Sequence, residues 1–329
     1  MRDPARVFSL FVRKAMSDPK PLTCSALVFV IVLAAAGSAS VPRNEAGRPA
    51  WTATYVANEG FLIATPGGTI LCDALFGGIT GDWCDQPSAE TVEMLKGAAG
   101  PFAGVGVVTV SHAHADHFDP HILVAHILHN PGVRVFCPNQ ARAVLERDPA
   151  WEKIKTNVFA VTPDQGRDET FEAGPIRVRV LRVDHGPYLE DDPTTKERVN
   201  RHRNVENLAF VLEAGEMRMI HAGDASPASS GSLRGYLAGD ERLDLAFLDR
   251  AFCAAAGREI VERDIRPDVL VYMHIRPGDA PKFQGCVDAS RAGAPELVLF
   301  EKPGDVRMFP IKERPGFVAS PFLCSPGTF

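Results

Sequence analysis

The sequence predicts a mixed α+β fold, and three observations support this prediction. Short β-rich runs are separated by Gly- and Pro-containing turns, which indicates hairpins. Capped helical patterns are interspersed among these runs. Several of the predicted strands end at a histidine or an aspartate. Both residue types bind metals, so the functional chemistry is expected where strands end.

The folded part of the chain begins with a predicted antiparallel meander. Residues 51–56, 61–64 and 69–72 are β-rich, and turn sequences at 58–60 and 66–68 separate them. The third run ends at Asp73. Residues 88–98 then carry a helical pattern with Ser88 as the expected N-cap and Gly97 at its end.

The most informative stretch runs from Ser111 to Asp119, directly after an apolar run at 105–110 that predicts a buried strand. Three histidines and a carboxylate fall within six residues. Imidazole suits zinc and similar metals, and aspartate adds a harder oxygen ligand. Successive residues of a loop can point to different sides, so the four side chains could serve two adjacent metals. They are His112, His114, Asp116 and His117.

The chain continues with a helix at 121–130, for which Asp119 and Pro120 supply the expected N-cap and first residue. A strand at 133–137, a helix at 139–148 and a strand at 157–161 follow. His121, His126 and His129 lie on or beside the first of these helices. They fall outside the loop pattern, so we predict structural roles for them.

Further predicted strands carry metal-capable residues at their ends. An alternating strand at 176–183 runs into Asp184 and His185, a hairpin at 207–220 leads to Asp224, and a strand at 268–273 leads to His274. Strands are also expected at 243–248, 297–300 and 306–309. This recurrence at strand ends is a second indication of a metal site. The polar segment 187–204 interrupts the pattern, and its length indicates a functional or mobile loop.

The first 40 residues have the composition of a secretory signal. Five basic residues precede an apolar core at 26–36, and small residues follow at 37–40. An uncleaved N-terminal anchor is the alternative, and only then would the protein contact a membrane. Residues 41–50 are expected to form a linker, and residues 51–329 are expected to form the folded domain. We therefore expect an exported protein, either periplasmic or secreted, or anchored with its domain outside the cytoplasm.

Charge and cysteine content narrow the classes of partner. The formal net charge is −6, and it becomes −9 without residues 1–39, which carry five Lys/Arg and two Asp/Glu. An acidic protein without a basic face is unpromising for nucleic-acid binding, so we predict a small-molecule substrate. Six cysteines follow residue 40, and an exported protein permits disulfides among them. Their spacing fixes no pairing, although Cys72 and Cys84 are the closest pair in sequence.

The run His112-Ala113-His114-Ala115-Asp116-His117 closely resembles the His-x-His-x-Asp-His motif of the metallo-β-lactamase superfamily. The resemblance covers roughly residues 51–310. It implies a four-layer αββα sandwich, in which two mixed β-sheets are flanked by helices and a dinuclear metal site lies at one edge. Residues 58–63 and 206–210 also resemble the branch that contains ascorbate-6-phosphate lactonase.

The resemblance also implies a ligand set. His112, His114 and His185 would bind one metal, and Asp116, His117 and His274 the second. Asp224 would bridge both, so Asp116 and Asp224 are the expected catalytic carboxylates. Asp73 would support the ligands from behind, a part that Asp184 or His221 could share. His202 is expected to face solvent or substrate.

The resemblance implies a hydrolase with two Zn²⁺, although Mn²⁺ or Fe²⁺ would also suit the ligands. A hydroxide shared by the metals would attack an ester, a lactone or a phosphodiester. Aspartate stands at 224 where dinuclear β-lactamases of this fold typically have cysteine, which argues against a β-lactam substrate. Two alternatives remain open, namely an iron oxidoreductase resembling persulfide dioxygenases and a non-catalytic exported metal-binding protein.

Overall fold

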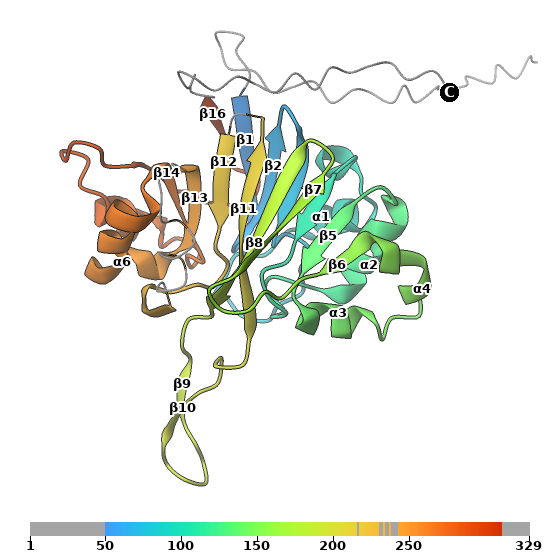
Figure 1. The fold of residues 1–329 in the computed structure, drawn as a ribbon, viewed down its shortest axis with the longest axis horizontal. Coiled ribbons are helices and arrows are strands. Elements are labelled where there is room, and N and C mark those ends of the chain that lie inside the picture. Colours follow the sequence, from blue (N-terminus) through green and yellow to red (C-terminus); the bar gives the residue numbers. More distant parts are fainter. Residues whose placement is uncertain (1–49, 216, 230–232, 234–236, 238–242, 311–329) are drawn as a thin grey trace, which may run out of the picture. The chain divides into compact units, whose positions relative to one another are not determined.

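The computed structural model describes residues 50–310 except 216, 230–232, 234–236 and 238–242 (Figure 1). All of these belong to one compact unit, Val41–Phe329. The predicted signal at 1–40 lies outside the described residues, as does most of the predicted linker. Ala50, the last residue of that linker, already belongs to the first strand.

The first sheet has the strand order β16-β1-β2-β3-β4-β5-β6. Its strands β16, β1, β2 and β3 pair antiparallel, and β3 to β6 pair parallel. The bounds are β1 Ala50–Ala57, β2 Gly60–Thr65, β3 Gly68–Cys72, β4 Val107–Thr109, β5 Arg134–Cys137, β6 Val158–Ala160 and β16 Val306–Pro310. The predicted meander is therefore confirmed, and the last described strand joins its outer edge.

The second sheet has the order β15-β14-β13-β12-β11-β8-β7. It is antiparallel from β7 to β12 and parallel from β12 to β15. The bounds are β7 Asp168–Ala173, β8 Ile176–Asp184, β11 Glu206–Ala214, β12 Met217–His221, β13 Leu243–Asp249, β14 Pro267–Met273 and β15 Glu296–Val298. Both sheets are thus mixed, as the family resemblance implies.

Helices cover the outer face of each sheet (Figure 1). Helices α1 to α4 pack on the first sheet through side chains such as Leu95, Leu123 and Leu145. Helix α6 and its neighbours pack on the second through Phe252 and Ile265. The bounds are α1 Ala89–Lys96, η2 Gly100–Phe102, α2 Pro120–His129, α3 Asn139–Leu145, α4 Trp151–Ile154, η3 Lys155–Asn157, η4 Pro227–Ser229, η5 Arg250–Cys253, α6 Ala255–Ile260, η6 Val261–Ile265 and η7 Ala280–Cys286.

A third apolar core lies between the two sheets. The rings of Phe61 from the first sheet and Phe247 from the second lie 4.6 Å apart and are fully buried. Together with the two outer cores, this layer gives the four-layer arrangement that was predicted. Strands buried on both faces explain the nearly continuous apolar runs of β4 and β13.

The segment 187–204 forms a short antiparallel hairpin, β9 Leu189–Asp191 and β10 Arg198–Asn200. This arm projects from the body of the molecule (Figure 1). Tyr188 and Leu189 at its base are about half exposed. The sequence indicated a loop here because the pairing strands are polar and only three residues long.

A disulfide joins Cys253 and Cys286. Cys72, Cys84 and Cys137 are free and buried, so the pairing of Cys72 with Cys84 that sequence proximity suggested is wrong. Cys72 lies inside β3 with its side chain in the core between the sheets. Burial also raises the pKa of the Cys72 thiol to about 12.

Replacement of Cys253 and Cys286 by serine is expected to lower the free energy of unfolding by about 3–4 kcal/mol. The bond closes a loop across 33 residues and so restricts the unfolded chain. Guanidinium unfolding with and without reductant measures the effect. Reductant should destabilise the wild type and leave the double variant unchanged, and an equal effect on both would contradict this role.

Within the described ranges, no helix has the length and apolar character needed to cross a bilayer.

Candidate metal centre

Five strand ends from both sheets meet at one edge of the sandwich. From the first sheet, β3 is followed by Asp73 and β4 by the His-rich loop. From the second sheet, β8, β12 and β14 are followed by His185, Asp224 and His274. Parallel strands present their carboxyl ends at the same edge. The topology therefore gathers residues that are more than 200 positions apart in sequence.

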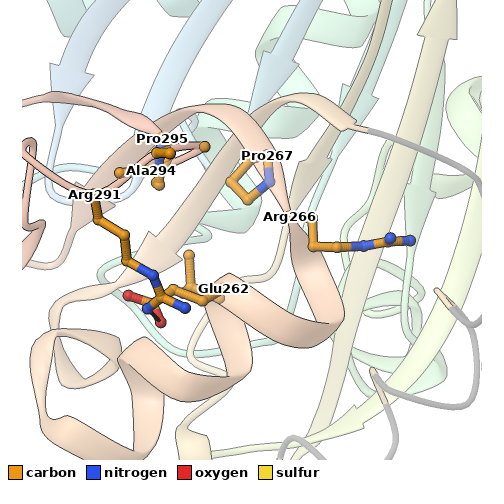
Figure 2. Close-up of a pocket in the computed structure, with 9 residues that line it drawn as sticks. Glu262, Arg266, Pro267, Arg291, Ala294 and Pro295 are labelled. Carbon is orange, nitrogen blue, oxygen red and sulfur yellow. Dashed lines mark hydrogen bonds and ion pairs between the residues drawn. The ribbon is translucent and has the colours of Figure 1, made fainter.

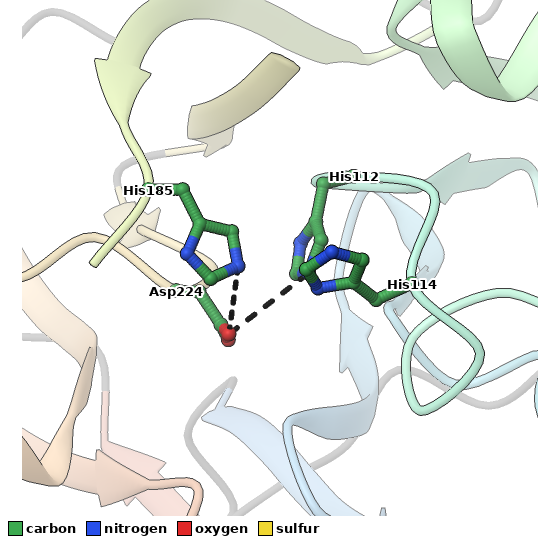
Figure 3. Close-up of side chains that lie close together, drawn as sticks. All are labelled: His112, His114, His185 and Asp224. Carbon is green, nitrogen blue, oxygen red and sulfur yellow. Dashed lines mark hydrogen bonds and ion pairs between the residues drawn. The ribbon is translucent and has the colours of Figure 1, made fainter. Parts of the chain in front are cut away.

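His112, His114, His185 and Asp224 form the first group, and one potential ligand atom of each lies within 4.8 Å of the others. Figure 3 shows their side chains pointing toward one another. His112 Nε2 lies 2.9 Å from His114 Nδ1, and His185 Nε2 lies 3.1 Å from Asp224 Oδ2. We call this group the first position.

Asp116, His117 and His274 form the second group, again within 4.8 Å. Asp116 Oδ2 lies 3.3 Å from His117 Nε2 and 3.5 Å from His274 Nε2. Asn58 donates its side-chain N–H to the same oxygen at 3.1 Å and so fixes the carboxylate. We call this group the second position.

Asp224 connects the two positions. Its Oδ2 lies 3.1 Å from His185 Nε2 and 3.9 Å from His112 Nε2, both of the first position. Its Oδ1 lies 3.1 Å from His117 Nε2 of the second. Each oxygen of one carboxylate thus faces a different group, which is the arrangement that a bridging ligand requires.

Four of the five imidazoles donate their Nδ1 proton to a partner behind them. His112 donates to Ser111 Oγ, His117 to Asp73 Oδ2, His185 to the Gly186 carbonyl and His274 to Asp249 Oδ2, at 2.8 to 3.0 Å. Such bonds fix the ring and its tautomer. Each Nε2 therefore faces the centre, where the neutral ring would offer its lone pair to a metal.

Asp73 accepts hydrogen bonds from two residues of the His-rich loop. Its Oδ2 accepts from His117 Nδ1 at 2.9 Å and from the Ser111 hydroxyl, while Oδ1 accepts from the Ser111 backbone N–H at 2.7 Å. Asp73 is 1 % exposed and adopts a left-handed backbone with φ of 42°. A non-glycine residue in this conformation is held there by its surroundings. These contacts hold the His117 ring and the start of the His-rich loop in place.

Replacement of Asp73 by asparagine is expected to weaken metal binding about 10- to 100-fold, because the partner of His117 loses its charge. Isothermal titration of the metal-stripped protein measures this. Asp184→Asn is a matched control, because that carboxylate is exposed and accepts from Gln165 instead. Equal affinity in the wild type and Asp73→Asn would contradict the role of Asp73.

The donor set fits a pair of divalent cations. His117 Nε2, His185 Nε2, His274 Nε2 and Asp224 Oδ1 are buried without a hydrogen-bond partner among the described residues. Orphaned buried polar atoms are rare in native proteins and ask for an explanation. Metal ligation supplies one, since these are the same atoms that point at the two positions.

Burial also favours the neutral imidazoles that metals need. It lowers the pKa of His112 well below its usual range and that of His114 to about 4, and in both cases neighbouring histidines lower it further. His112 is fully buried. A neutral ring keeps its lone pair available. A metal binding at the first position would therefore compete little with protons for these nitrogens.

Close packing forces a glycine before Asp224. Gly223 has φ of +52°, and a Cβ there would lie 2.5 Å from the Ser111 Cβ. Any side chain at this position would push the loop after β12 away from the His-rich loop. The glycine therefore lets Asp224 approach both groups.

Three residues that sequence reasoning did not place in the centre contribute to it. They are Asn58, Glu59 and Asp249. Asp249 is the last residue of β13, so the same signal of an acidic residue at a strand end could have identified it. Asn58 and Glu59 stand in a tight turn, where polar residues are expected for other reasons.

The three other residues considered for supporting or substrate-facing roles lie in different environments. The proposed supporting role of Asp184 is wrong, because this residue is exposed and bonds Gln165 at 2.6 Å. His221 is buried and donates its Nε2 proton to the Glu59 carbonyl at 2.9 Å, so it fixes the turn that carries Glu59. The ring of His202 lies 4.2 Å from that of His185 and 4.8 Å from that of His114. His202 thus lies beside the first position, at the base of the arm.

The histidines of α2 lie apart from the centre. His126 is buried and donates to the Leu95 carbonyl at 2.6 Å. His129 bonds the Ala125 carbonyl on the surface. Neither they nor His121 joins a metal-capable group within the described part of the chain.

A separate cavity of about 360 Å³ lies beside η6 and is lined by Glu262, Arg266, Pro267, Arg291 and neighbouring residues (Figure 2). Two of the lining residues, Arg291 and Glu262, form an ion pair. It contains none of the predicted ligands.

The fold and the converging His/Asp set define a protein of the metallo-β-lactamase type. The family model described as "Beta-lactamase superfamily domain" matches residues 68–292, and the chain belongs to this family. Comparison with curated proteins gives no significant match.

Solved structures of two other organisms share the fold. A metallo hydrolase from the archaeon Ignicoccus hospitalis is 17 % identical, with a TM-score of 0.53 and 80 % and 100 % of the two chains covered. The metallo-β-lactamase fold protein YhfI from Bacillus subtilis is 16 % identical, with a TM-score of 0.52 and coverages of 79 % and 99 %. At this identity the likeness establishes the fold alone.

Proposed function

We propose that this protein is a dinuclear metal-dependent hydrolase, with zinc as the expected metal, that cleaves an ester, a lactone or a phosphodiester in a small molecule. The observation that carries the proposal is the placement of Asp224, whose two oxygens face two separate groups of imidazoles. Membership of the family supports a metal-dependent enzyme of this kind.

Two neighbouring divalent cations would supply an activated water and polarise a substrate oxygen. The chain's own residues prepare the site for that chemistry. Asp224 faces both positions, and Asn58 keeps the Asp116 carboxylate facing inward. Partners behind the imidazoles prevent the rings from turning, so little reorganisation is needed during the reaction.

The substrate would approach from the side of the arm. His202 and Tyr188 lie there, with ring centroids 5.3 Å apart. The neutral form of His202 is favoured, because burial and then the neighbouring His185 lower its pKa. A neutral imidazole beside the first position is suited to hydrogen-bonding a polar group of a small substrate. The acidic net charge supports a small molecule over a nucleic acid.

We also propose that the protein acts outside the cytoplasm. The N-terminal composition suggests export, and the Cys253–Cys286 disulfide supports an oxidising compartment.

Reconstitution of the metal-stripped protein with Zn²⁺, Mn²⁺ or Fe²⁺ tests the proposed function. Each form is assayed on nitrophenyl esters, on lactones of several ring sizes and on bis(nitrophenyl) phosphate. Hydrolysis of at least one class that rises until two equivalents of metal are bound would support the proposal. Oxygen consumption with one bound iron and no hydrolysis would overturn it.

A further inference from the structure

Glu59 is a buried carboxylate with no hydrogen-bonding role. It is 0 % exposed, and neither of its oxygens has a hydrogen-bond partner among the described residues. An ionised carboxylate taken out of water without a partner costs several kcal/mol. The residue therefore needs either a proton or a nearby cation.

Its neighbours include ligands of the second position and the carboxylates behind them. One Glu59 oxygen lies within 4.8 Å of ligand atoms of Asp224, Asp249 and His274. Glu59 Oε2 also lies 3.8 Å from His117 Nδ1. The carboxylate thus lies close to Asp224 and His274, which would hold the second metal, and it faces His117 from the Nδ1 side of that ring.

Glu59 is not needed to orient those imidazoles. The Nδ1 proton of His117 is already given to Asp73, and that of His274 to Asp249. The Glu59 backbone is itself held in place, because its carbonyl accepts from His221 at 2.9 Å. A fixed, buried and unpaired carboxylate beside a cation position has the properties of an oxygen ligand.

We propose that Glu59 contributes a carboxylate oxygen to the second position, and that this makes the centre asymmetric; the inference rests on the proposed dinuclear function. The first position offers three imidazoles and one oxygen of Asp224. The second offers two imidazoles and oxygens from Asp116, Asp224 and Glu59. Carboxylates suit Mn²⁺, whereas imidazoles suit zinc. The second position therefore retains Mn²⁺ better than the first does.

Glu59→Gln and Glu59→Ala test this assignment. Glu213→Gln is the control, because it makes the same chemical change at the far end of β11, where the carboxylate pairs with Arg177 and Arg218. The full chain is stripped of metal and titrated with Zn²⁺ and with Mn²⁺ by calorimetry. Bound Mn²⁺ is counted by electron paramagnetic resonance. Thermal unfolding of the metal-free variants reports whether they fold.

The wild type should bind one Mn²⁺ at least tenfold more tightly than either Glu59 variant does. The affinity for the first equivalent of Zn²⁺ should differ less than threefold between the wild type and the variants. Metal-free Glu59→Gln should unfold no lower than the metal-free wild type, because without a cation the buried carboxyl carries a proton, and glutamine is a neutral side chain of the same size. The control should match the wild type in each measurement.

Equal Mn²⁺ binding in the wild type and both variants would overturn the assignment, as would a parallel loss of both metals. If the wild type binds two metals but the Glu59 variants bind Mn²⁺ and Zn²⁺ with the same selectivity as the wild type, the dinuclear proposal stands and this inference is rejected. Binding of one metal or none by the wild type would instead contradict the proposed function itself.

Discussion

Replacement of Asp224 by alanine is expected to reduce hydrolysis by at least about 10³-fold, which corresponds to about 4 kcal/mol of transition-state stabilisation. The change removes an oxygen from both positions at once. It also leaves His117 Nε2 and His185 Nε2 without their shared neighbour. Metal content should fall below two per chain in the same preparation.

Asp184→Ala is the matched control, because this aspartate precedes His185 but is exposed. It should retain activity and metal within about twofold of the wild type, the range of a surface substitution. Activity of Asp224→Ala within tenfold of the wild type, measured at saturating metal, would reject the bridging role.

Removal of the metals by a chelator is expected to abolish activity and to lower the stability of the folded domain. Without cations, the carboxylates of Glu59 and Asp224 lie within 4.8 Å of each other with no metal charge beside them. Metal at 1,000 times its Kd contributes about 4 kcal/mol for each site. Thermal unfolding before and after chelation, with re-addition of Zn²⁺ as the control, measures this. An unchanged unfolding temperature would contradict it.

The metal-free protein should respond to pH in a defined direction. Burial lowers the pKa of His117 and His274, but Asp224 and other carboxylates outweigh burial and hold both pKa values well above the usual range. Their contribution to stability is fully present below the usual histidine pKa and is lost as pH rises through the raised values. Metal affinity should show the opposite trend, because bound metal must displace these protons.

The elements that could be predicted from sequence are those with local signals. Ser88 caps α1 by accepting from the Thr91 N–H, and Asp119 caps α2 by accepting from His121 and Ile122. Both helices begin where their N-caps indicated. Strand β7 was missed because most of its side chains are exposed, so it lacks an apolar pattern. The pairing of β16 with β1 joins distant parts of the chain, which no local signal records.

The metal-capable residues were predictable because their positions repeat one rule, a histidine or aspartate after a strand. The rule selected Asp184 wrongly, since neighbouring positions point to opposite sides and only His185 turns inward. The sequence does not single out Glu59, because the role proposed for it depends on burial. A glutamate in a tight turn is ordinarily exposed, and only the tertiary structure encloses it.

The number of metal ions bound per chain is the most direct test of the proposed dinuclear centre. The purified chain is saturated with Zn²⁺, freed of unbound metal by gel filtration and measured by mass spectrometry of the metal against protein concentration. We predict two ions per chain in the wild type and fewer than two in Asp224→Ala. One ion per chain at saturation in both proteins would contradict the dinuclear centre.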